Sequence, residues 1–365
     1  MHLENGRRWT TDRVNEWWAA RNWLCGFNFL PSTSVNFLEM WMGETFDRDA
    51  IDRELGWAAA VGFNSVRTNP HFLVWEHDRD GLMERLDWFL TTATKHGIIT
   101  MPVLFDDCGF GGFEPVYGKQ PDPATHIHNS RAVASPGRAA LTDRAQWPSF
   151  KGYVQDVIST FGNDARILLW DLYNEPGNMS VFTQTGEQQE FDAAVKALSR
   201  DLMLECFEWA REIDPSQPLT VGAWRVADLE GGNLDFDNEI DRLALEHSDV
   251  ITFHAYTSKE RVNGMIDQLS AFDRPMMVTE WMARTLGSKF DDQLQLYKDR
   301  NVSCYNWGLV QGRTQTHFPW PHTLSDADKS DISQVGWFHD VFRPDGTPYK
   351  ASETQLISDV TQAAK

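Results

Sequence analysis

The chain has 365 residues, which is long enough for one large or two ordinary domains and for a sizeable buried core. Its 53 Asp and Glu residues outnumber its 33 Lys and Arg residues, and the formal net charge of −20 argues against nucleic acid or an anionic membrane surface as a partner. A neutral ligand is expected instead. The four cysteines, Cys25, Cys108, Cys206 and Cys304, lack CxxC spacing, so neither a zinc site nor a disulfide framework is predicted.

The amino-terminal segment, residues 1–22, is mixed in character and rich in tryptophan, and we expect it to cover the floor of the fold or to pack outside it. It has no apolar stretch of signal-peptide length, and no run of about 18 apolar residues occurs in the chain. We therefore expect a cytoplasmic protein. A signal removed from a precursor stays open as an alternative.

Short apolar runs alternate with helical patterns along the rest of the chain. Strands are predicted at residues 23–29, 63–68, 98–105, 167–174, 219–223, 250–256, 276–280 and 302–307. Helices are predicted at residues 47–61, 81–96, 146–161, 187–213, 238–247, 258–272, 291–300 and 352–364. This alternation, without a linker-like break, predicts an α/β fold: a single (β/α)8 TIM barrel over residues 1–365. Long βα loops, residues 106–142 and 308–333, follow strands 3 and 8.

Two of the predicted strands run directly into a glutamate. Residues 167–172 are almost continuously apolar, as in a parallel strand buried on both faces, and Pro176 must stop that strand just after Glu175. The apolar strand that begins at Met276 ends in the same way at Glu280. Ligands bind at the carboxyl ends of the strands in parallel α/β folds. Two glutamates delivered there predict one shared site, whereas a single one would more simply be read as a helix cap.

Four strand ends carry an ordered set of residues: Asn174-Glu175-Pro176 on the fourth, His254-Ala255-Tyr256 on the sixth, Glu280 on the seventh and Trp307 on the eighth. This set resembles the retaining β-glycosidase barrels of glycoside hydrolase family 5, the cellulase-like group of clan A. The resemblance implies that Glu175 is the acid/base and Glu280 the nucleophile, with neither metal nor organic cofactor.

Retaining hydrolysis requires the two carboxyl groups to lie about 5–5.5 Å apart. Strands 4 and 7 face each other across a barrel that is just wide enough for side chains to meet in its middle, so the two glutamates can reach that separation. We expect their repulsion to raise the pKa of Glu175 while Glu280 stays ionised.

Three further residues are expected to support the nucleophile. His254 and Tyr256 are two apart on a strand and point to one face, next to the strand of Glu280, so Tyr256 can donate a hydrogen bond to that carboxylate. The resemblance also places Arg67 near Glu280, where its charge lowers the pKa of the nucleophile. The alternatives that stay open are a buried His-Tyr pair with a purely structural role and a surface salt bridge for Arg67.

The resemblance assigns Asn174 to the 2-hydroxyl of the sugar and Trp307 to an aromatic floor beneath it. Other candidates for sugar contacts are Asn28, Glu39, His71, Asp106, Asp107, His126, His128, Trp320 and His322. Family 5 enzymes commonly carry a His near the end of strand 3, but here that strand runs into Asp106 and Asp107. His71 is the candidate for a neighbouring role.

The sequence thus predicts a retaining β-glycosidase that forms a glycosyl-enzyme intermediate and acts in an exo manner on short, plant-type neutral oligosaccharides. An endo-acting β-glycanase of the cellulase, mannanase or xylanase kind is the alternative.

Two other classes are weighed. A metal-dependent isomerase or aldolase barrel could use His126 and His128 with nearby carboxylates, but a His-x-His in a loop lacks the rigid spacing of a ligand pair, and no lysine ends a strand for a Schiff base. A sugar-binding barrel without catalysis is disfavoured because both glutamates are present. The sugar, the linkage and the oligomeric state are not predicted.

Overall fold

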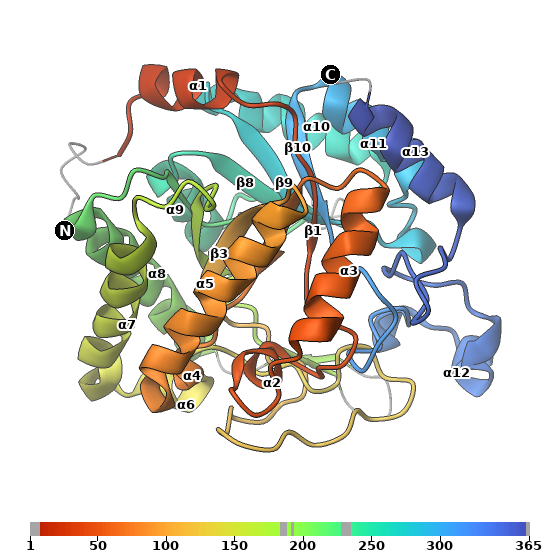
Figure 1. Ribbon diagram of the computed structural model, residues 1–365, viewed down its shortest axis with the longest axis horizontal. Helices are drawn as coiled ribbons and strands as arrows, with labels where there is room; N and C mark the ends of the chain where they lie inside the picture. Colours follow the sequence, from red (N-terminus) through yellow and green to blue (C-terminus); the bar gives the residue numbers. More distant parts are fainter. Residues whose placement is uncertain (1–7, 183–187, 191–192, 228–234, 363–365) are drawn as a thin grey trace.

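The computed structural model describes residues 8–182, 188–190, 193–227 and 235–362. Its main feature is an eight-stranded parallel sheet in the spatial order β7-β4-β3-β2-β1-β10-β9-β8 (Figure 1). The strands are β1 (Cys25–Asn28), β2 (Ser65–Thr68), β3 (Ile99–Asp106), β4 (Trp170–Asn174), β7 (Leu219–Thr220), β8 (Ile251–Ala255), β9 (Met276–Trp281) and β10 (Val302–Asn306).

The sheet closes on itself between its first and last strands. Beyond the end of β7, Ala223 forms a parallel bridge with Phe253 of β8. The Ala223 amide donates to the Thr252 carbonyl at 3.0 Å, and the His254 amide donates to the Ala223 carbonyl at 2.9 Å. The predicted (β/α)8 barrel is therefore confirmed.

Helices surround the barrel (Figure 1). They are α1 (Thr11–Ala19), α2 (Phe37–Trp41), α3 (Arg48–Ala60), α4 (Phe72–His77), α5 (Arg79–Lys95), α6 (Arg138–Thr142), α7 (Trp147–Phe161), α8 (Ala193–Ile213), α9 (Glu239–His247), α10 (Lys259–Leu269), α11 (Phe290–Asp299), α12 (Asp326–Ser330) and α13 (Ala351–Gln362). In the part of the chain that the structure describes, none of them is both long and apolar enough to cross a bilayer.

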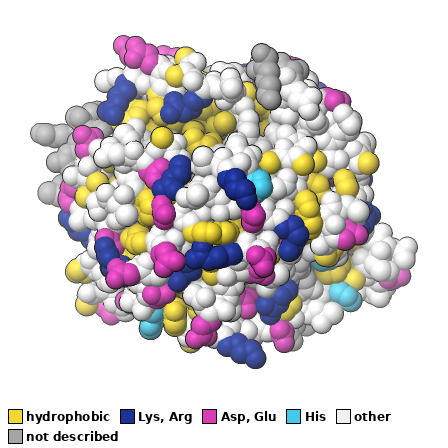
Figure 2. Space-filling view, viewed as in Figure 1, with side chains coloured by type: hydrophobic (Ala, Val, Ile, Leu, Met, Phe, Trp, Pro, Cys, Tyr) yellow, Lys and Arg dark blue, Asp and Glu magenta, His cyan; other side chains and the backbone are white. Residues whose placement is uncertain are grey.

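The helix α5 illustrates how the sequence produces this outer layer. Asp78 accepts a hydrogen bond from the Gly81 amide and caps the first turn. Leu82, Leu86 and Phe89 recur at three- and four-residue spacing, and all are buried. The opposite side carries charge: Figure 2 shows acidic and basic side chains interspersed over this face of the molecule. Surface ion pairs such as Arg48–Glu84, at 3.3 Å, contribute little stability each.

The amino-terminal segment closes one end of the barrel. Trp9, Val14 and Trp18 are buried in a cluster with residues from the starts of the strands: Leu24, Met101, Leu168, Leu169, Val250, Met277 and Tyr305. Figure 1 shows α1 at the end of the barrel opposite α2 and α6. The packing agrees with the expected cover over the barrel floor for residues 8–22, and residues 1–7 of that segment lie outside the described residues.

The predicted helix at residues 187–213 was wrong at its start. Gln188–Glu190 form the strand β6, which pairs antiparallel with β5 (Ser180–Phe182), and the helix α8 begins only at Ala193. Glutamine and glutamate are good helix formers, so these residues extended the helical pattern backwards. Residue 187, like residues 363 and 364 of the predicted terminal helix, lies outside the described residues. Several short helices, α2, α4, α6 and α12, were not predicted either.

The loops at the carboxyl ends of the strands interlock. We call residues 29–47 the β1 loop, residues 107–137 the β3 loop and residues 307–325 the β10 loop. The Asn129 amide donates to the Thr314 carbonyl at 2.8 Å, and the His128 ring Nδ1 lies 2.7 Å from the Phe318 carbonyl oxygen. The two long loops predicted after strands 3 and 8 therefore lie against each other over the barrel mouth.

Candidate active site

A cavity of about 290 Å³ opens at the carboxyl ends of the strands. Among the residues that line it are Asn28, Phe37, Asp106, Cys108, His128, Asn174, Glu175, Asn178, Trp224, His254, Tyr256, Glu280, Trp307, Trp320, His322, His339 and Asp340. The lining combines aromatic rings with many convergent polar groups. Both predicted glutamates are in it.

Glu175 is held in a strained turn at the end of β4. Its φ of 45° lies in the left-handed region, which non-glycine residues seldom adopt, and Pro176 follows it. The Oε1 atom lies 2.8 Å from His254 Nδ1. The Oε2 atom accepts from Asn178 Nδ2 at 2.5 Å and from Cys108 Sγ at 3.1 Å. Each of these partners can donate a hydrogen bond to a Glu175 oxygen, so together they favour the carboxylate form.

Glu280 is surrounded by donors from two other strands. Arg67 Nη1 donates to Oε1 at 3.0 Å, and the Tyr256 hydroxyl donates to Oε2 at 2.9 Å. A register shift between β8 and β9 places His254 directly opposite Glu280, and the His254 Nδ1 atom lies 3.5 Å from Oε2. The expected hydrogen bond from Tyr256 and the expected proximity of Arg67 are both present in the structure.

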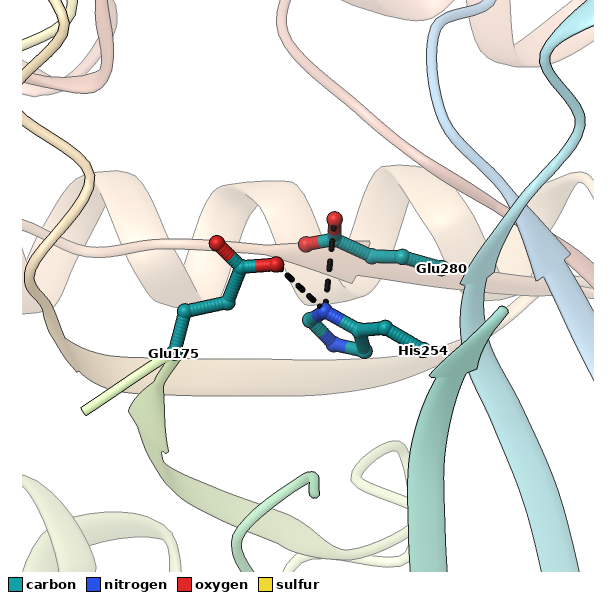
Figure 3. Close-up of side chains that lie close together, drawn as sticks. All are labelled: Glu175, His254 and Glu280. Atoms are coloured by element: carbon teal, nitrogen blue, oxygen red, sulfur yellow. Dashed lines mark hydrogen bonds and ion pairs between the residues drawn. The ribbon is translucent and has the colours of Figure 1, made fainter. Parts of the chain in front are cut away.

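The two carboxyl groups face each other across the imidazole of His254 (Figure 3). One oxygen of Glu175, one oxygen of Glu280 and one ring nitrogen of His254 lie within 4.8 Å of one another. This spacing resembles the 5–5.5 Å of retaining glycosidases and is well below the roughly 6.5–9.5 Å of inverting ones. The three atoms are also close enough to hold a small cation.

Arg67 is the centre of a fully buried polar network. Its guanidinium donates to Asp171, Asn28, Glu280 and Asn174 at distances of 2.7 to 3.0 Å. The side chain is 0 % exposed. Five donors in a fixed planar fork allow one residue to orient several acceptors at once. Arg67 thus fixes Glu280 and the Asn174 amide relative to each other, and it does not form the surface salt bridge that was the alternative.

The pKa values of the two glutamates differ from our expectation. Burial raises the pKa of Glu175, but the hydrogen bond and the charge of His254, followed by the bonds from Cys108 and Asn178, outweigh it and lower this pKa below its ordinary value. Burial and the neighbouring charge of Glu175 raise the pKa of Glu280 against the opposing His254, Arg67 and Tyr256. Burial lowers the pKa of His254, yet the two carboxylates raise it overall. The sequence predicted His254 beside Glu280 but did not indicate that the same imidazole would also contact Glu175.

Several other predicted contacts line the cavity. Asn174 is held on both sides, because its Oδ1 accepts from Arg67 and its Nδ2 donates to Asp106 at 2.9 Å. Burial raises the pKa of Asp106 to about 7, with the Asn174 bond opposing. Trp307 packs edge-on against Phe37, with ring centroids 6.4 Å apart. The remaining predicted residues in the lining are Asn28, His128, Trp320 and His322.

Four residues that were predicted to contact the substrate are not among the cavity-lining residues. Glu39 is buried and pairs with Arg313 at 3.1 Å. Asp107 accepts from the Tyr173 hydroxyl at 2.8 Å and from the Gly177 amide, which fixes the turn after Glu175 from behind. His71 caps α4, and burial lowers its pKa to about 3. His126 is exposed, and its ring packs against Phe318 with ring centroids 5.3 Å apart. Polar residues near a strand end can hold a loop in place through hydrogen bonds and ion pairs, and they then need not contact a ligand.

Sequence reasoning also missed several functional candidates. Cys108 and Asn178 contact Glu175 directly, yet the cysteine was read only for metal or disulfide spacing. Its position two residues after Asp106, at the end of β3, is the signal that could have indicated it. Trp224, His339 and Asp340 line the cavity from segments whose approach depends on loop geometry alone.

The alternative metal set does not assemble. Of its two loop histidines, only His128 lines the cavity, and its Nδ1 atom is bonded to the Phe318 carbonyl. Within the described residues, the cluster suited to a metal consists of the two glutamates and His254.

The fold and the site together define a (β/α)8 barrel with paired carboxylates at the ends of its fourth and seventh strands. Residues 33–312 match the family described as cellulase (glycosyl hydrolase family 5), and the chain belongs to this family. The resemblance seen in the sequence is thereby confirmed.

Curated relatives are mannan-degrading by name. The chain is 27% identical over 161 residues to mannan endo-1,4-beta-mannosidase A of Aspergillus aculeatus, covering 37% of this chain and 38% of the relative. It is 25% identical over 217 residues to the probable mannan endo-1,4-beta-mannosidase F of Neosartorya fischeri, covering 54% and 42%. The matches therefore span less than half of the length of these relatives.

Solved structures share the fold. The exo-beta-1,4-mannosidase Op5Man5 from Opitutaceae bacterium strain TAV5 has a TM-score of 0.57 at 16% identity, with coverage of 100% of this chain and 63% of that chain. The endo-1,4-beta-mannanase from Rhizomucor miehei also has a TM-score of 0.57 at 16% identity, covering 94% and 95%.

Proposed function

We propose that this protein is a retaining β-glycosidase that removes single β-linked mannosyl units from the ends of neutral oligosaccharides. The observation that carries the proposal is the pair Glu175 and Glu280. One carboxylate oxygen of Glu175 lies within 4.8 Å of one carboxylate oxygen of Glu280, in a cavity at the barrel mouth. Membership of glycosyl hydrolase family 5 supports the same reaction class.

In the first half-reaction, an oxygen of Glu280 attacks the anomeric carbon while Glu175 protonates the departing glycosidic oxygen. The C–O bond to the leaving group breaks, and an ester bond to Glu280 forms. Arg67 and Tyr256 hold the Glu280 carboxylate in place through hydrogen bonds at 3.0 and 2.9 Å. Since these donors are fixed before the sugar arrives, they need no reorganisation during the reaction.

In the second half-reaction, Glu175 takes a proton from a water molecule whose oxygen attacks the anomeric carbon and releases Glu280. Two inversions at one carbon leave the configuration unchanged. Once Glu280 is esterified its negative charge is gone, so the protonation preferences of His254 and Glu175 change together.

The proton needed for the first step is held between two groups. His254 Nδ1 lies 2.8 Å from Glu175 Oε1, and the other ring nitrogen, Nε2, is buried and has no hydrogen-bond partner among the described residues. The ring nitrogen that faces the acids is therefore the one that can exchange a proton with Glu175. Because His254 contacts both Glu175 and Glu280, a change of protonation at any one of the three residues shifts the pKa values of the other two.

The substitution His254→Asn should move the pH optimum of kcat/KM toward alkaline values. Asparagine keeps a hydrogen-bond donor but loses the positive charge that lowers the pKa of both Glu175 and Glu280. Both values then rise, so ionisation of Glu280 (the acid limb) and loss of the Glu175 proton (the alkaline limb) both occur at higher pH. His322→Asn, which replaces a cavity-lining ring that packs against Trp320 and Phe182, is the control and should leave both limbs in place. An unchanged or acid-shifted profile in His254→Asn would contradict this role.

The arrangement of the loops supports an exo mode. With Glu175 on the side of the leaving group, the sugar held by the nucleophile extends toward Trp307 and Phe37. The β1, β3 and β10 loops are joined to one another at this mouth: Asn36, which lines the cavity, donates to Gln120 at 3.0 Å, and Arg313 pairs with Asp122 at 3.0 Å. A longer glycan would have to pass through this bonded wall, so a pocket that accepts a chain end is favoured over an open groove.

The choice of mannose rests on the names of the relatives, which are endo- and exo-acting mannan enzymes. Reducing-end-labelled β-1,4-mannopentaose tests mode and sugar together. The proposal expects mannose and labelled tetrasaccharide as the first products, with β-mannose released before mutarotation. A ladder of mid-length fragments from the first minutes would show endo action. If aryl β-glucosides or β-xylosides are cleaved faster than the aryl β-mannoside, the preferred sugar is glucose or xylose and the proposal of mannose is wrong.

A further inference from the structure

Cys108 makes an unexpected contact with the proposed acid/base. Its Sγ atom lies 3.1 Å from Glu175 Oε2. Asn174 Nδ2 and Asn178 Nδ2 lie 3.4 and 3.7 Å from the same sulfur, in positions to donate to it. Because two amides approach the sulfur as donors, the thiol hydrogen is left to point at Glu175, the acceptor that it meets among the described residues.

The position of the thiol is fixed by the end of β3. The Cys108 amide donates to Asp106 Oδ1 at 2.8 Å, and the same oxygen accepts from Asn174 at 2.9 Å. Asp106 is also tied to Asn69, whose Nδ2 lies 3.2 Å from its other carboxylate oxygen. The thiol is thus part of a bonded chain that joins β2, β3 and β4 at the wall of the cavity.

The surroundings keep this thiol protonated. Burial raises the pKa of Cys108 well above its ordinary value, and the charges of Asp106, Glu175 and Glu280 raise it further. A thiol in this environment is a hydrogen-bond donor, and it is unsuited to act as a nucleophile or metal ligand. The cavity-lining position leaves it beside the group that must lose a proton when the leaving group departs.

We propose that Cys108 is a positioning residue, whose thiol orients the Glu175 carboxyl group and stabilises the carboxylate that forms as its proton passes to the leaving group. The thiol keeps its own proton throughout. This inference rests on the proposed role of Glu175 as acid/base. His254 on the other oxygen of Glu175 supplies charge and a proton, whereas Cys108 supplies a neutral donor on Oε2.

The test compares Cys108→Ala and Cys108→Ser by their kcat/KM for aryl β-mannosides. Alanine removes the donor, and kcat/KM for a poor leaving group such as phenol should fall about 10-fold, because a hydrogen bond to a charged group is lost. With 2,4-dinitrophenol, which departs without protonation, the loss should vanish. The alkaline limb of the pH profile should also move to higher pH in Cys108→Ala, since His254 and Asn178 alone then support the carboxylate against Asp106 and Glu280.

Serine keeps a hydroxyl donor and should restore both the alkaline limb and most of the activity. Cys206→Ala is the matched control, because it removes a fully buried thiol on α8 that does not line the cavity. If Cys108 only fills space, Cys108→Ala will lose activity equally for good and poor leaving groups, without any change in the pH profile, and the inference fails.

The variant Glu175→Ala separates this failure from that of the proposed function. It should show a strong dependence on the leaving group whatever Cys108 does. If Glu175→Ala shows that dependence and Cys108→Ala does not, only the role of Cys108 is wrong. If neither shows it, the acid/base role of Glu175 is wrong as well.

Discussion

Replacing Glu280 by alanine is expected to lower kcat by at least about 10⁴-fold, the scale seen when a member of a concerted catalytic set is removed. The side chain is 6 % exposed and its carboxylate is held by Arg67 and Tyr256, so removal leaves a small polar space beside the anomeric carbon. Azide is small enough to enter that space. It should restore turnover of an activated aryl β-mannoside and yield the α-mannosyl azide.

The matched experiment is Glu175→Ala with the same azide and substrate. There the glycosyl-enzyme still forms on Glu280, and azide attacks from the opposite face, so the product should be the β-mannosyl azide. The configuration of the two products therefore assigns the two glutamates independently of any rate. If Glu280→Ala gave the β-azide and Glu175→Ala the α-azide, Glu175 would be the nucleophile and Glu280 the acid/base. A Glu280→Ala protein with near-normal activity would contradict the proposed mechanism.

Replacing Arg67 by alanine is expected to cost about 3–5 kcal/mol of unfolding free energy and nearly all activity, because breaking a buried ion pair leaves uncompensated charge behind. Asp171, at 2.8 Å, and Glu280, at 3.0 Å, both lose their partner. Without Arg67 their pKa values rise, and protonation relieves the buried charge as pH falls. The difference in urea midpoint between wild type and variant should therefore narrow toward acidic pH.

Arg211→Ala provides the control for that measurement. Arg211 pairs with Asp249 at 3.1 Å, with side chains 9% and 0% exposed, near the amino ends of β7 and β8. Its loss should also destabilise the protein but leave kcat per folded molecule close to that of the wild type. If Arg67→Ala behaved in the same way, Arg67 would serve stability alone. Circular dichroism at the assay temperature should accompany each rate, so that unfolding is not read as lost catalysis.

The barrel and its two glutamates could be predicted because each depends on local sequence. Burial on both faces gives the segments around β4 and β9 nearly continuous apolar runs, interrupted by Asp171 and Thr279, and Pro176 marks the end of the first of them. The order of the strands then places Glu175 and Glu280 face to face with no further information. In a parallel barrel the carboxyl ends of all strands lie at the same side, so residues that end distant strands in the sequence meet in one site.

What could not be predicted depends on how loops fold back. Glu39 and His71 are polar residues near strand ends, yet neither lines the cavity. Glu39 forms an ion pair with Arg313, and the His71 side chain caps the first turn of α4. Cys108 became important only because the chain after β3 turns so that its thiol meets the residue after β4. The depressed pKa of Glu175 has the same origin, since it requires His254 to lie within hydrogen-bond reach of both acids.

The closed floor of the barrel has one more consequence. In the part of the chain that the structure describes, Trp9, Val14 and Trp18 pack into the end of the barrel opposite the cavity and close it. In the proposed pocket, the truncated glycan occupies the mouth and the freed monosaccharide sits behind it. The two products must then leave in a fixed order. The shortened chain diffuses away first and the monosaccharide second, and the next substrate molecule can bind only after both have left.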